Sequence, residues 1–103
     1  MVTFYTTFHL SNENYPKGLD YLKTVYVPAA MRSGKLRNPR IQKVVDDNEA
    51  VNGVSLSVQC SADDRQTLEE WMRGDGTWIH LNITDRFKDE IALFSTILEE
   101  IEL

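Results

Sequence analysis

The most regular feature of the chain is an alternation of apolar and polar residues near its start. In residues 2–10 the even positions are Val, Phe, Thr, Phe and Leu, whereas Thr, Tyr, Thr and His occupy the odd positions. A period of two with many β-branched and aromatic residues is typical of a strand. Residues 54–60 repeat the alternation, with Val, Leu, Val and Cys against Ser, Ser and Gln. We therefore predict two strands, each with one apolar face.

A helix is predicted between these strands. Apolar side chains recur at helical spacing over residues 15–30. Asn14 is positioned to cap this helix, and Pro16 is tolerated in its first turn. Pro28 lacks an amide hydrogen and crowds the preceding turn, so we expect it to kink or interrupt the helix. Gly34 stands where a glycine commonly ends a helix.

The segment after this helix predicts an edge strand and a turn. Residues 36–46 suit a strand, and Pro39 places it at a sheet edge because proline cannot donate a ladder hydrogen bond. Residues 47–53, which begin with Asp-Asn-Glu and end in Asn-Gly, predict a hairpin connection.

A second helix is predicted after the strand at residues 54–60. Residues 61–64 (Ser-Ala-Asp-Asp) fit a capping box, and Leu68, Trp71 and Met72 continue the helix. The Gly-Asp-Gly at residues 74–76 is expected to break or fray it.

The remaining segment fits two interpretations. Residues 77–84 alternate like a strand and residues 85–101 recur like a helix, but residues 91–97 also fit a strand. The local pattern alone slightly favours a strand followed by a helix.

Three segments resemble a known family. Residues 26–36 (Tyr-Val-Pro-Ala-Ala-Met-Arg-Ser-Gly-Lys-Leu) resemble a His-Ile-Pro…Met/Leu-x-Thr-Gly-x-Phe segment. Residues 53–60 resemble a Gly-Val-Thr-Tyr-x-Val-Gln-Tyr strand, and residues 86–99 resemble an Arg-Tyr…Phe-Val-Ala-Phe-Arg-Thr-Leu-Leu-Glu ending. Over nearly its whole length, the chain is similar to a small bacterial family known as a domain of unknown function.

The resemblance implies an α+β fold, the ferredoxin-like βαββαβ sandwich of the dimeric α/β-barrel type. Helices would cover one face of a four-stranded antiparallel sheet. Residues 91–98 would form the fourth strand, and residues 62–84 one helical region broken near 74–76. We adopt this over the local pattern. The family offers no established activity, and it often has His where this chain has Tyr26, so no acid–base role is carried over.

The two central strands of such a fold predict an uncharged open face. Its residues are Thr3, Tyr5, Thr7, His9, Ser55, Ser57 and Gln59. A solvated sheet face usually carries Lys and Glu, and a face buried within one chain would be apolar. We therefore expect a homodimer whose sheets face each other. A solvated Thr/Ser-rich face is the alternative. The candidate small-ligand cavity is formed by Tyr5, His9, Tyr26, Ser57 and Gln59.

Charge is unevenly distributed along the chain. The net charge is −5, yet residues 32–43 carry five basic side chains and no acid: Arg32, Lys35, Arg37, Arg40 and Lys43. Such a basic patch could bind nucleic acid, or it could face the acidic half of the same molecule or of a partner. An acidic chain with no aromatic residue in the basic stretch argues against nucleic acid.

Length and composition predict one domain over residues 1–103. Hydrophobic residues make up 42% and charged residues 26%, as in ordinary globular domains. No apolar run reaches the roughly 20 residues that span a bilayer, so no membrane contact is expected. Cys60 is the single cysteine, which excludes an internal disulfide and makes a cytoplasmic location the default.

No catalytic signature emerges from the remaining residues. His9, His80 and Cys60 do not converge on one point, so neither a metal nor a cofactor is expected. Cys60 is interpreted as a buried structural thiol, and Trp71 and Trp78 as core or dimer anchors.

The most favoured function is a non-enzymatic homodimer that binds a small ligand or a partner. The alternative is a cofactor-independent monooxygenase-like or isomerase-like enzyme that uses a cavity on the open sheet face. The sequence leaves open whether the protein is an enzyme and favours a protein that is not one.

Overall fold

The sheet is the framework of the protein. The computed structural model describes residues 1–45 and 53–103. Its four strands form one antiparallel sheet in the order β2-β3-β1-β4. The strands are β1 (Val2–Leu10), β2 (Arg37–Lys43), β3 (Val54–Ala62) and β4 (Ile91–Glu99).

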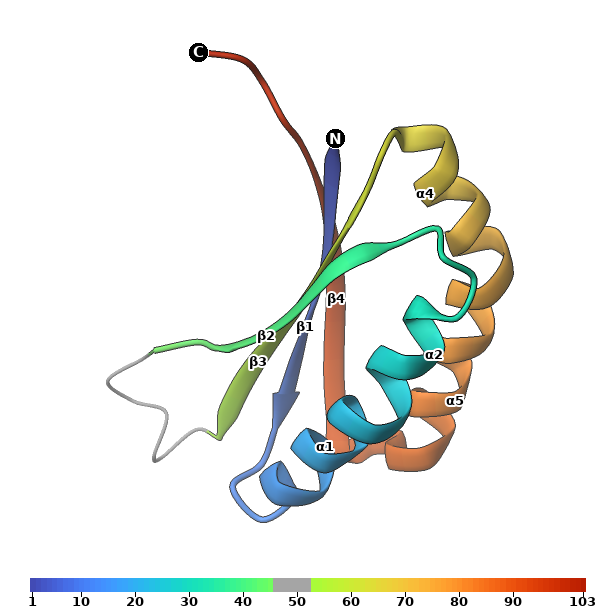
Figure 1. Cartoon of the computed structure of the whole chain (residues 1–103). Coiled ribbons are helices and arrows are strands. Elements are labelled where there is room, and N and C mark those ends of the chain that lie inside the picture. Colours follow the sequence, from blue (N-terminus) through green and yellow to red (C-terminus); the bar gives the residue numbers. More distant parts are fainter. Residues whose placement is uncertain (46–52) are drawn as a thin grey trace.

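Two long helical segments cover one face of this sheet and leave the other face open (Figure 1). The first runs through α1 (Tyr15–Tyr21), a π-helical turn η1 (Leu22–Tyr26) and α2 (Val27–Met31). The second runs through α4 (Arg65–Trp71), a π-helical turn η2 (Met72–Gly76), α5 (Thr77–Phe87) and a short 3₁₀ turn η3 (Lys88–Glu90). This is the predicted βαββαβ order. The strand β4 confirms the interpretation taken from the family resemblance and corrects the local pattern.

The core lies between the sheet and the helices, as the alternation predicts. In β1 the even-numbered residues are all buried, and in β3 the same holds from Val54 to Ala62. Phe8 lies opposite Leu56 of β3 and Leu93 of β4. The indole of Trp71 packs edge-on against Phe4 and donates a hydrogen bond to a carbonyl of the first helical segment. Apolar burial therefore ties both helices to the two central strands.

Neither helix is interrupted where the sequence predicts a break. Pro28 and the glycines at 74–76 both fall at or just after a π-helical turn. In the first turn the amide of Val27 bonds to the Leu22 carbonyl, one residue further back than in an α-helix. In the second, the Thr77 hydroxyl donates to the Met72 carbonyl at 2.7 Å. A widened turn satisfies these groups locally, so the helix continues instead of ending.

The helix caps differ from those predicted. The second helix begins at Asp64, whose carboxylate accepts the amide of Thr67 at 2.8 Å, while Ser61 belongs to β3. Asn14 precedes α1, but its side chain bonds to Ser11 and caps nothing. The predicted capping box at residues 61–64 is therefore wrong, because Asp64 caps the helix alone.

The edge strand is confirmed and is shorter than expected. β2 pairs with β3 alone in the described part of the chain, and its pairing shifts between Arg37 and Arg40 around Pro39. The predicted hairpin at residues 47–53 lies outside the described residues except for Gly53. Gly34 has a φ of 78° and donates its amide to Met31, as predicted for the helix end.

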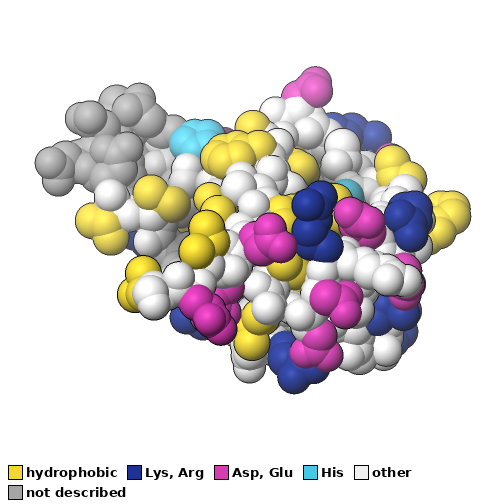
Figure 2. Space-filling model, turned by 90° about the horizontal axis from the view of Figure 1, so that it is seen from above, with side chains coloured by type: hydrophobic (Ala, Val, Ile, Leu, Met, Phe, Trp, Pro, Cys, Tyr) yellow, Lys and Arg dark blue, Asp and Glu magenta, His cyan; other side chains and the backbone are white. Residues whose placement is uncertain are grey.

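Charged side chains of both signs are interspersed on one face of the molecule. On the face seen in Figure 2, Lys and Arg side chains stand next to Asp and Glu side chains. No helix among the described residues is both long and apolar enough to cross a membrane.

We expect Gly53→Ala to destabilise the protein by about 2–3 kcal/mol. Gly53 has a φ of 97°, and a Cβ there would collide with the carbonyl oxygen of Leu10. Gly34→Ala is the matched control, because Gly34 also has a positive φ but its Cβ would meet open space; it should cost about 1 kcal/mol. Urea unfolding measures both, and equal losses would contradict the backbone collision.

Candidate functional site

A cavity of about 340 Å³ lies between the second helical segment and the sheet. The cavity exists because the helices leave β4 partly uncovered. Ser95 and Ile97 face the helices in register with Thr6 and Phe4 of β1, yet both remain exposed. None of the lining side chains carries a formal charge, counting His as neutral: Phe4, Trp71, Met72, Gly76, Thr77, His80, Leu81, Thr84 and Ser95.

Trp71 and Gly76 shape the inner wall of this cavity. A Cβ on Gly76 would come within 2.7 Å of the Trp71 ring, so only glycine lets the indole pack this close to the π-helical turn. The π-helical turn η2 supplies Met72 and Gly76 to the wall, and α5 supplies His80 one turn further on. Such turns are frequent at functional sites.

A hydrogen-bonded pair of titratable groups stands behind the cavity wall. The Tyr26 hydroxyl lies 2.7 Å from His80 Nε2, and their rings are nearly parallel, 15° apart. Thr6 also bonds to the Tyr26 hydroxyl, and its own Oγ1 lies 2.8 Å from Ser95 Oγ. The four side chains thus form a continuous run of hydrogen bonds. His80 and Ser95, its two ends, both line the cavity.

Burial keeps Tyr26 and His80, the two titratable residues of this run, uncharged at neutral pH. It raises the pKa of the Tyr26 phenol far above its usual value, against a smaller lowering by the Thr6 hydrogen bond. Burial also lowers the pKa of the His80 imidazole. At neutral pH the site therefore holds a phenol and a neutral imidazole, which can exchange hydrogen bonds with an uncharged ligand.

Four of the predicted cavity residues lie on the open face of the sheet, and Tyr26 does not. Tyr5, Ser57 and Gln59 project from β1 and β3 away from the helices, whereas Tyr26 is buried on the helix side. The structure therefore does not bring Tyr26 together with the others. Its place at the end of the π-helical turn η1 aims it into the core.

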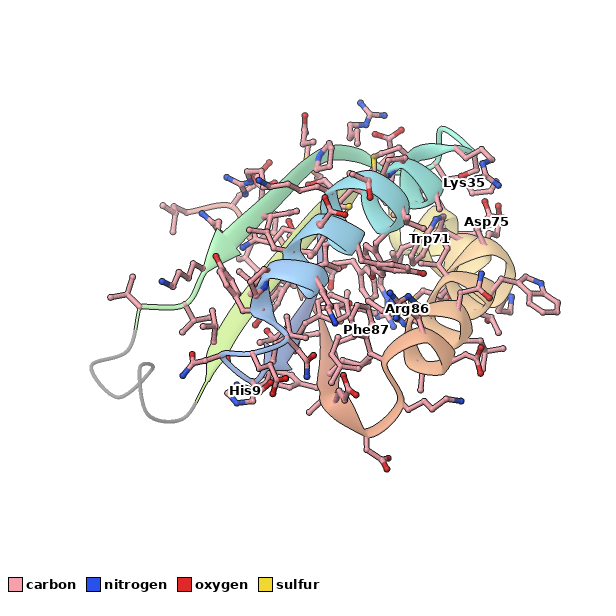
Figure 3. All side chains as sticks on the ribbon, turned by 90° about the horizontal axis from the view of Figure 1, so that it is seen from below. His9, Lys35, Trp71, Asp75, Arg86 and Phe87 are labelled. Carbon is pink, nitrogen blue, oxygen red and sulfur yellow. The ribbon has the colours of Figure 1, made fainter. Side chains whose placement is uncertain are left out.

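His9 lies far from this cavity. It occupies the end of β1 opposite Trp71 and Lys35 in Figure 3, and its Nδ1 lies 2.9 Å from Ser55 Oγ. His9 lines a separate depression of about 410 Å³ together with Asn14, Asp89 and Glu90. Among the described residues, no three His, Cys, Asp or Glu side chains come close enough to hold a metal ion.

The open face is uncharged across three strands. β4 adds Ala92, Phe94, Thr96 and Leu98, which lie in register with the outward residues of β1. Phe94 and Leu98 are 62% and 51% exposed. On β3, the Gln59 amide donates to Gln42 Oε1 at 2.6 Å and accepts from Arg40. The face is thus polar at its centre and apolar along β4.

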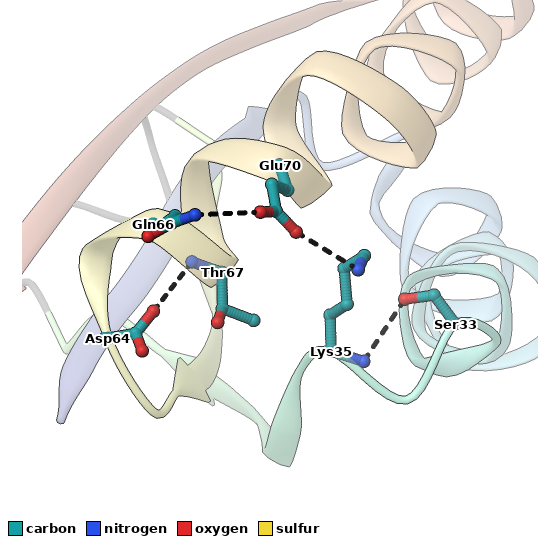
Figure 4. Close-up of polar contacts among 6 residues, drawn as sticks. All are labelled: Ser33, Lys35, Asp64, Gln66, Thr67 and Glu70. Carbon is teal, nitrogen blue, oxygen red and sulfur yellow. Dashed lines mark hydrogen bonds and ion pairs between the residues drawn. The ribbon is translucent and has the colours of Figure 1, made fainter.

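The predicted basic patch is partly neutralised within the chain. Lys35 lies 3.4 Å from Glu70, as Figure 4 shows, and Arg37 pairs with Asp63. Lys43 lies over the Tyr15 ring at 6.0 Å, and Arg32 lines a groove on the outer helical surface with Asp75. These contacts support the interpretation in which the patch faces the acidic half of the same molecule.

The remaining candidates divide between the core and the surface. Cys60 is buried, and burial raises its pKa to about 11, which suits a structural thiol. Trp71 is a core residue, as predicted. Trp78 is 68% exposed on the helical surface, so of its two predicted roles the core role is wrong, and the role of dimer anchor stays a prediction.

Sequence analysis missed Thr6, His80 and Ser95 as a group. Thr6 offers one signal, because it is a polar residue on the buried face of β1. A buried hydroxyl needs a partner, which points to a polar site beneath the helices. His80 gave no signal, because residues 77–84 fitted a strand by local pattern.

We expect the His80 imidazole to titrate below pH 6.5. Because its pKa is lowered in the folded protein, the unfolded chain binds more protons as the pH falls below 6.5. The free energy of unfolding should therefore fall over this interval. An NMR titration gives the midpoint, with His9→Gln as the variant that leaves a single histidine. A midpoint at or above 6.5 would contradict a buried neutral imidazole.

The comparisons with known proteins agree with this architecture. Residues 1–101 match the family described as "Domain of unknown function (DUF4286)". None of the curated proteins matches the chain.

Solved structures with the same fold come from several kinds of protein. An EthD family protein from Bacillus halodurans is 17% identical with a TM-score of 0.72, covering 98% of this chain and 100% of its own. A dimeric ferredoxin-like protein from an uncultured marine organism is 14% identical with a TM-score of 0.72, covering 99% and 97%. SnoaB, a cofactor-independent oxygenase from Streptomyces nogalater, is 10% identical with a TM-score of 0.68, covering 99% and 94%.

At these identities the likeness shows the fold alone, which is ferredoxin-like. The match over residues 1–101 shows the family: the chain belongs to the family of the domain of unknown function DUF4286.

Proposed function

We propose that the protein is a homodimeric domain that binds a small, uncharged and largely apolar ligand in each subunit. The observation that carries the binding function is the cavity against β4. It is large enough for a small molecule, its lining has no formal charge, and the Tyr26–His80 pair supplies neutral hydrogen-bonding groups at its wall. Apolar walls with a few placed polar groups are typical of ligand sites.

The open sheet face supports the homodimer. Exposed apolar side chains on β4 would remain in water in a single chain, whereas a second copy would cover them. The central polar residues of β1 and β3 would then meet their counterparts across a two-fold axis. On this proposal Tyr5, His9, Ser57 and Gln59 belong to the subunit interface, and the ligand lies on the other side of the sheet.

A second candidate function is catalysis in the same cavity without a cofactor. It is favoured by His80, because a neutral imidazole at the cavity wall can accept a proton from a bound ligand. Tyr26 would then orient the ring as the base. Under this function His80→Gln would stop conversion of the ligand, while the Gln amide keeps a hydrogen-bonding group at the cavity wall; a binding domain would convert nothing.

The ligand site can be tested with 2-naphthol, a neutral aromatic molecule with one hydroxyl. In ¹H–¹⁵N NMR spectra it should shift the Trp71 indole signal and the amides of α5 around His80. Ser95→Leu fills the cavity from β4 and should abolish these shifts. Ser57→Leu makes the same change on the open face and should leave them in place. If Ser57→Leu alone blocks binding, the ligand site is on the open face and the proposal fails.

The subunit interface can be tested with two apolar-to-acid variants. Phe94→Glu places a charge on the open face, where burial against a second copy would be costly, so it should make the protein monomeric. Trp78→Glu is the control, because Trp78 is equally exposed on the helical surface. Sedimentation velocity separates the two states. A dimer that survives Phe94→Glu and dissociates with Trp78→Glu would place the interface on the helices.

A further inference from the structure

The hydrogen bonds behind the cavity wall share a small number of hydrogens. The run leads from the Ser95 hydroxyl through Thr6 and the Tyr26 phenol to Nε2 of His80, so three bonds join three hydroxyls and one imidazole. A hydroxyl has one hydrogen to donate, and a neutral imidazole carries its single hydrogen on Nδ1 or on Nε2. The direction of one bond in the run therefore affects the direction of the next.

Burial of Thr6 and Tyr26 restricts the run to two arrangements. Thr6 is fully buried and Tyr26 is 3% exposed, so neither hydroxyl can donate to bulk water. Within the described residues, both hydroxyls bond only to members of the run. Since a buried donor without an acceptor is costly, both hydrogens must be used inside the run. Either every hydroxyl donates in the direction of His80, or every bond is reversed and points to Ser95.

The two ends of the run therefore always have opposite character. When the hydroxyls donate towards His80, Nε2 accepts, so Nδ1 carries the hydrogen and the Ser95 oxygen is left as an acceptor. When the bonds are reversed, Nε2 donates, so Nδ1 is an acceptor and the Ser95 hydroxyl is free to donate. His80 and Ser95 both line the cavity, and Nδ1 has no hydrogen-bond partner among the described residues.

We infer that the cavity selects ligands with one hydrogen-bond donor and one acceptor, which bind Nδ1 of His80 and the Ser95 hydroxyl at the same time. Neutral hydroxy ketones, hydroxy esters and lactams belong to this class. A ligand with two acceptors and no donor would place an acceptor against a lone pair at one end in either arrangement, which costs a hydrogen bond. The inference rests on the ligand site proposed above and specifies its ligand class.

Thr6 sets this selectivity although it does not line the cavity. Its hydroxyl couples the two ends, because it can donate to only one of its two neighbours at a time. Without that hydroxyl, Ser95 can donate into the cavity while Tyr26 still donates to His80, which leaves the hydrogen on Nδ1. Both ends then donate together, and a ligand with two acceptors is accommodated. Thr6 is therefore a positioning residue that acts through Ser95 and Tyr26.

Two isomeric aryl ketones test the selectivity. 3-Hydroxypropiophenone has a hydroxyl and a carbonyl, whereas 3-methoxyacetophenone has the same atoms but only acceptors. Dissociation constants follow from ¹H–¹⁵N NMR titrations that record the Trp71 indole signal. In the wild type, 3-hydroxypropiophenone should bind at least about tenfold more tightly, because the ether leaves one end of the run unsatisfied.

Thr6→Val and Thr6→Ser form the matched pair of variants. Thr6→Val removes the buried hydroxyl and keeps a β-branched side chain that suits a strand. It should bring the two dissociation constants within about threefold of each other, mainly by tighter binding of 3-methoxyacetophenone. Thr6→Ser keeps the hydroxyl and should keep the wild-type preference. A merely structural role of Thr6 would change the affinity for both isomers alike.

The remaining outcomes separate this inference from the proposed ligand site. If neither isomer nor 2-naphthol shifts the cavity signals, the ligand site and its selectivity are overturned together. If 2-naphthol binds but the isomers bind equally well, in the opposite order or not at all, the ligand site stands and the selectivity is overturned. A preference that persists in Thr6→Val, or that is lost in Thr6→Ser as well, also overturns the coupling through the Thr6 hydroxyl.

Discussion

The alternation of side chains along β1 and β3 is the constraint on which the rest of the structure depends. Because successive residues point to opposite faces, one strand supplies both the core beneath the helices and the surface on the other side. The even-numbered residues of β1 are buried without exception. The odd-numbered ones carry hydroxyls, an imidazole and a phenol but no charge. One face of the sheet is therefore apolar and must be buried under the helices. The other face is uncharged and is hydrated less strongly than a charged surface.

The way the helices cover the sheet creates the candidate site. They pack tightly over β1 and β3 but leave Ser95 and Ile97 of β4 exposed. Trp71 fills the space next to this gap, and Gly76 gives its ring room. The π-helical turn η1 carries Tyr26 and the π-helical turn η2 carries part of the cavity wall. The run of hydrogen bonds reaches the cavity at its two ends, His80 and Ser95. The polar atoms of that run satisfy one another, which makes their burial tolerable.

The fold could be predicted from the sequence, but only part of the candidate site could. Period-two patterning identified β1 and β3 because each has one apolar face, and Pro39 marked the edge strand by its missing amide hydrogen. The continuity of both helical segments is harder to predict from the sequence. A π-helical turn leaves no pattern in apolar spacing. The sequence therefore predicts that Pro28 kinks or interrupts one helix and that the glycines at 74–76 break or fray the other, whereas both helical segments continue. The Tyr26–His80 pair joins residues 54 positions apart, and only packing of the two helical segments brings them together.

The two faces of the sheet thus have different roles in this account. On the proposed function, the helix side holds a neutral ligand cavity within each subunit, and the open side joins two subunits. This division explains why Tyr5, Ser57 and Gln59 carry no charge although no helix covers them. It also explains why Phe94 and Leu98, the exposed apolar residues of the open face, lie on the strand that borders the cavity from the other side.

The most direct test of this division is an isotope-filtered NOE experiment on a mixture of ¹³C-labelled and unlabelled protein, which detects contacts between subunits only. The account predicts intermolecular NOEs among side chains of the open face, above all from the Phe94 ring to open-face side chains of the other subunit. Intermolecular NOEs confined to Trp78 and the outer helical surface, or none at all, would contradict it.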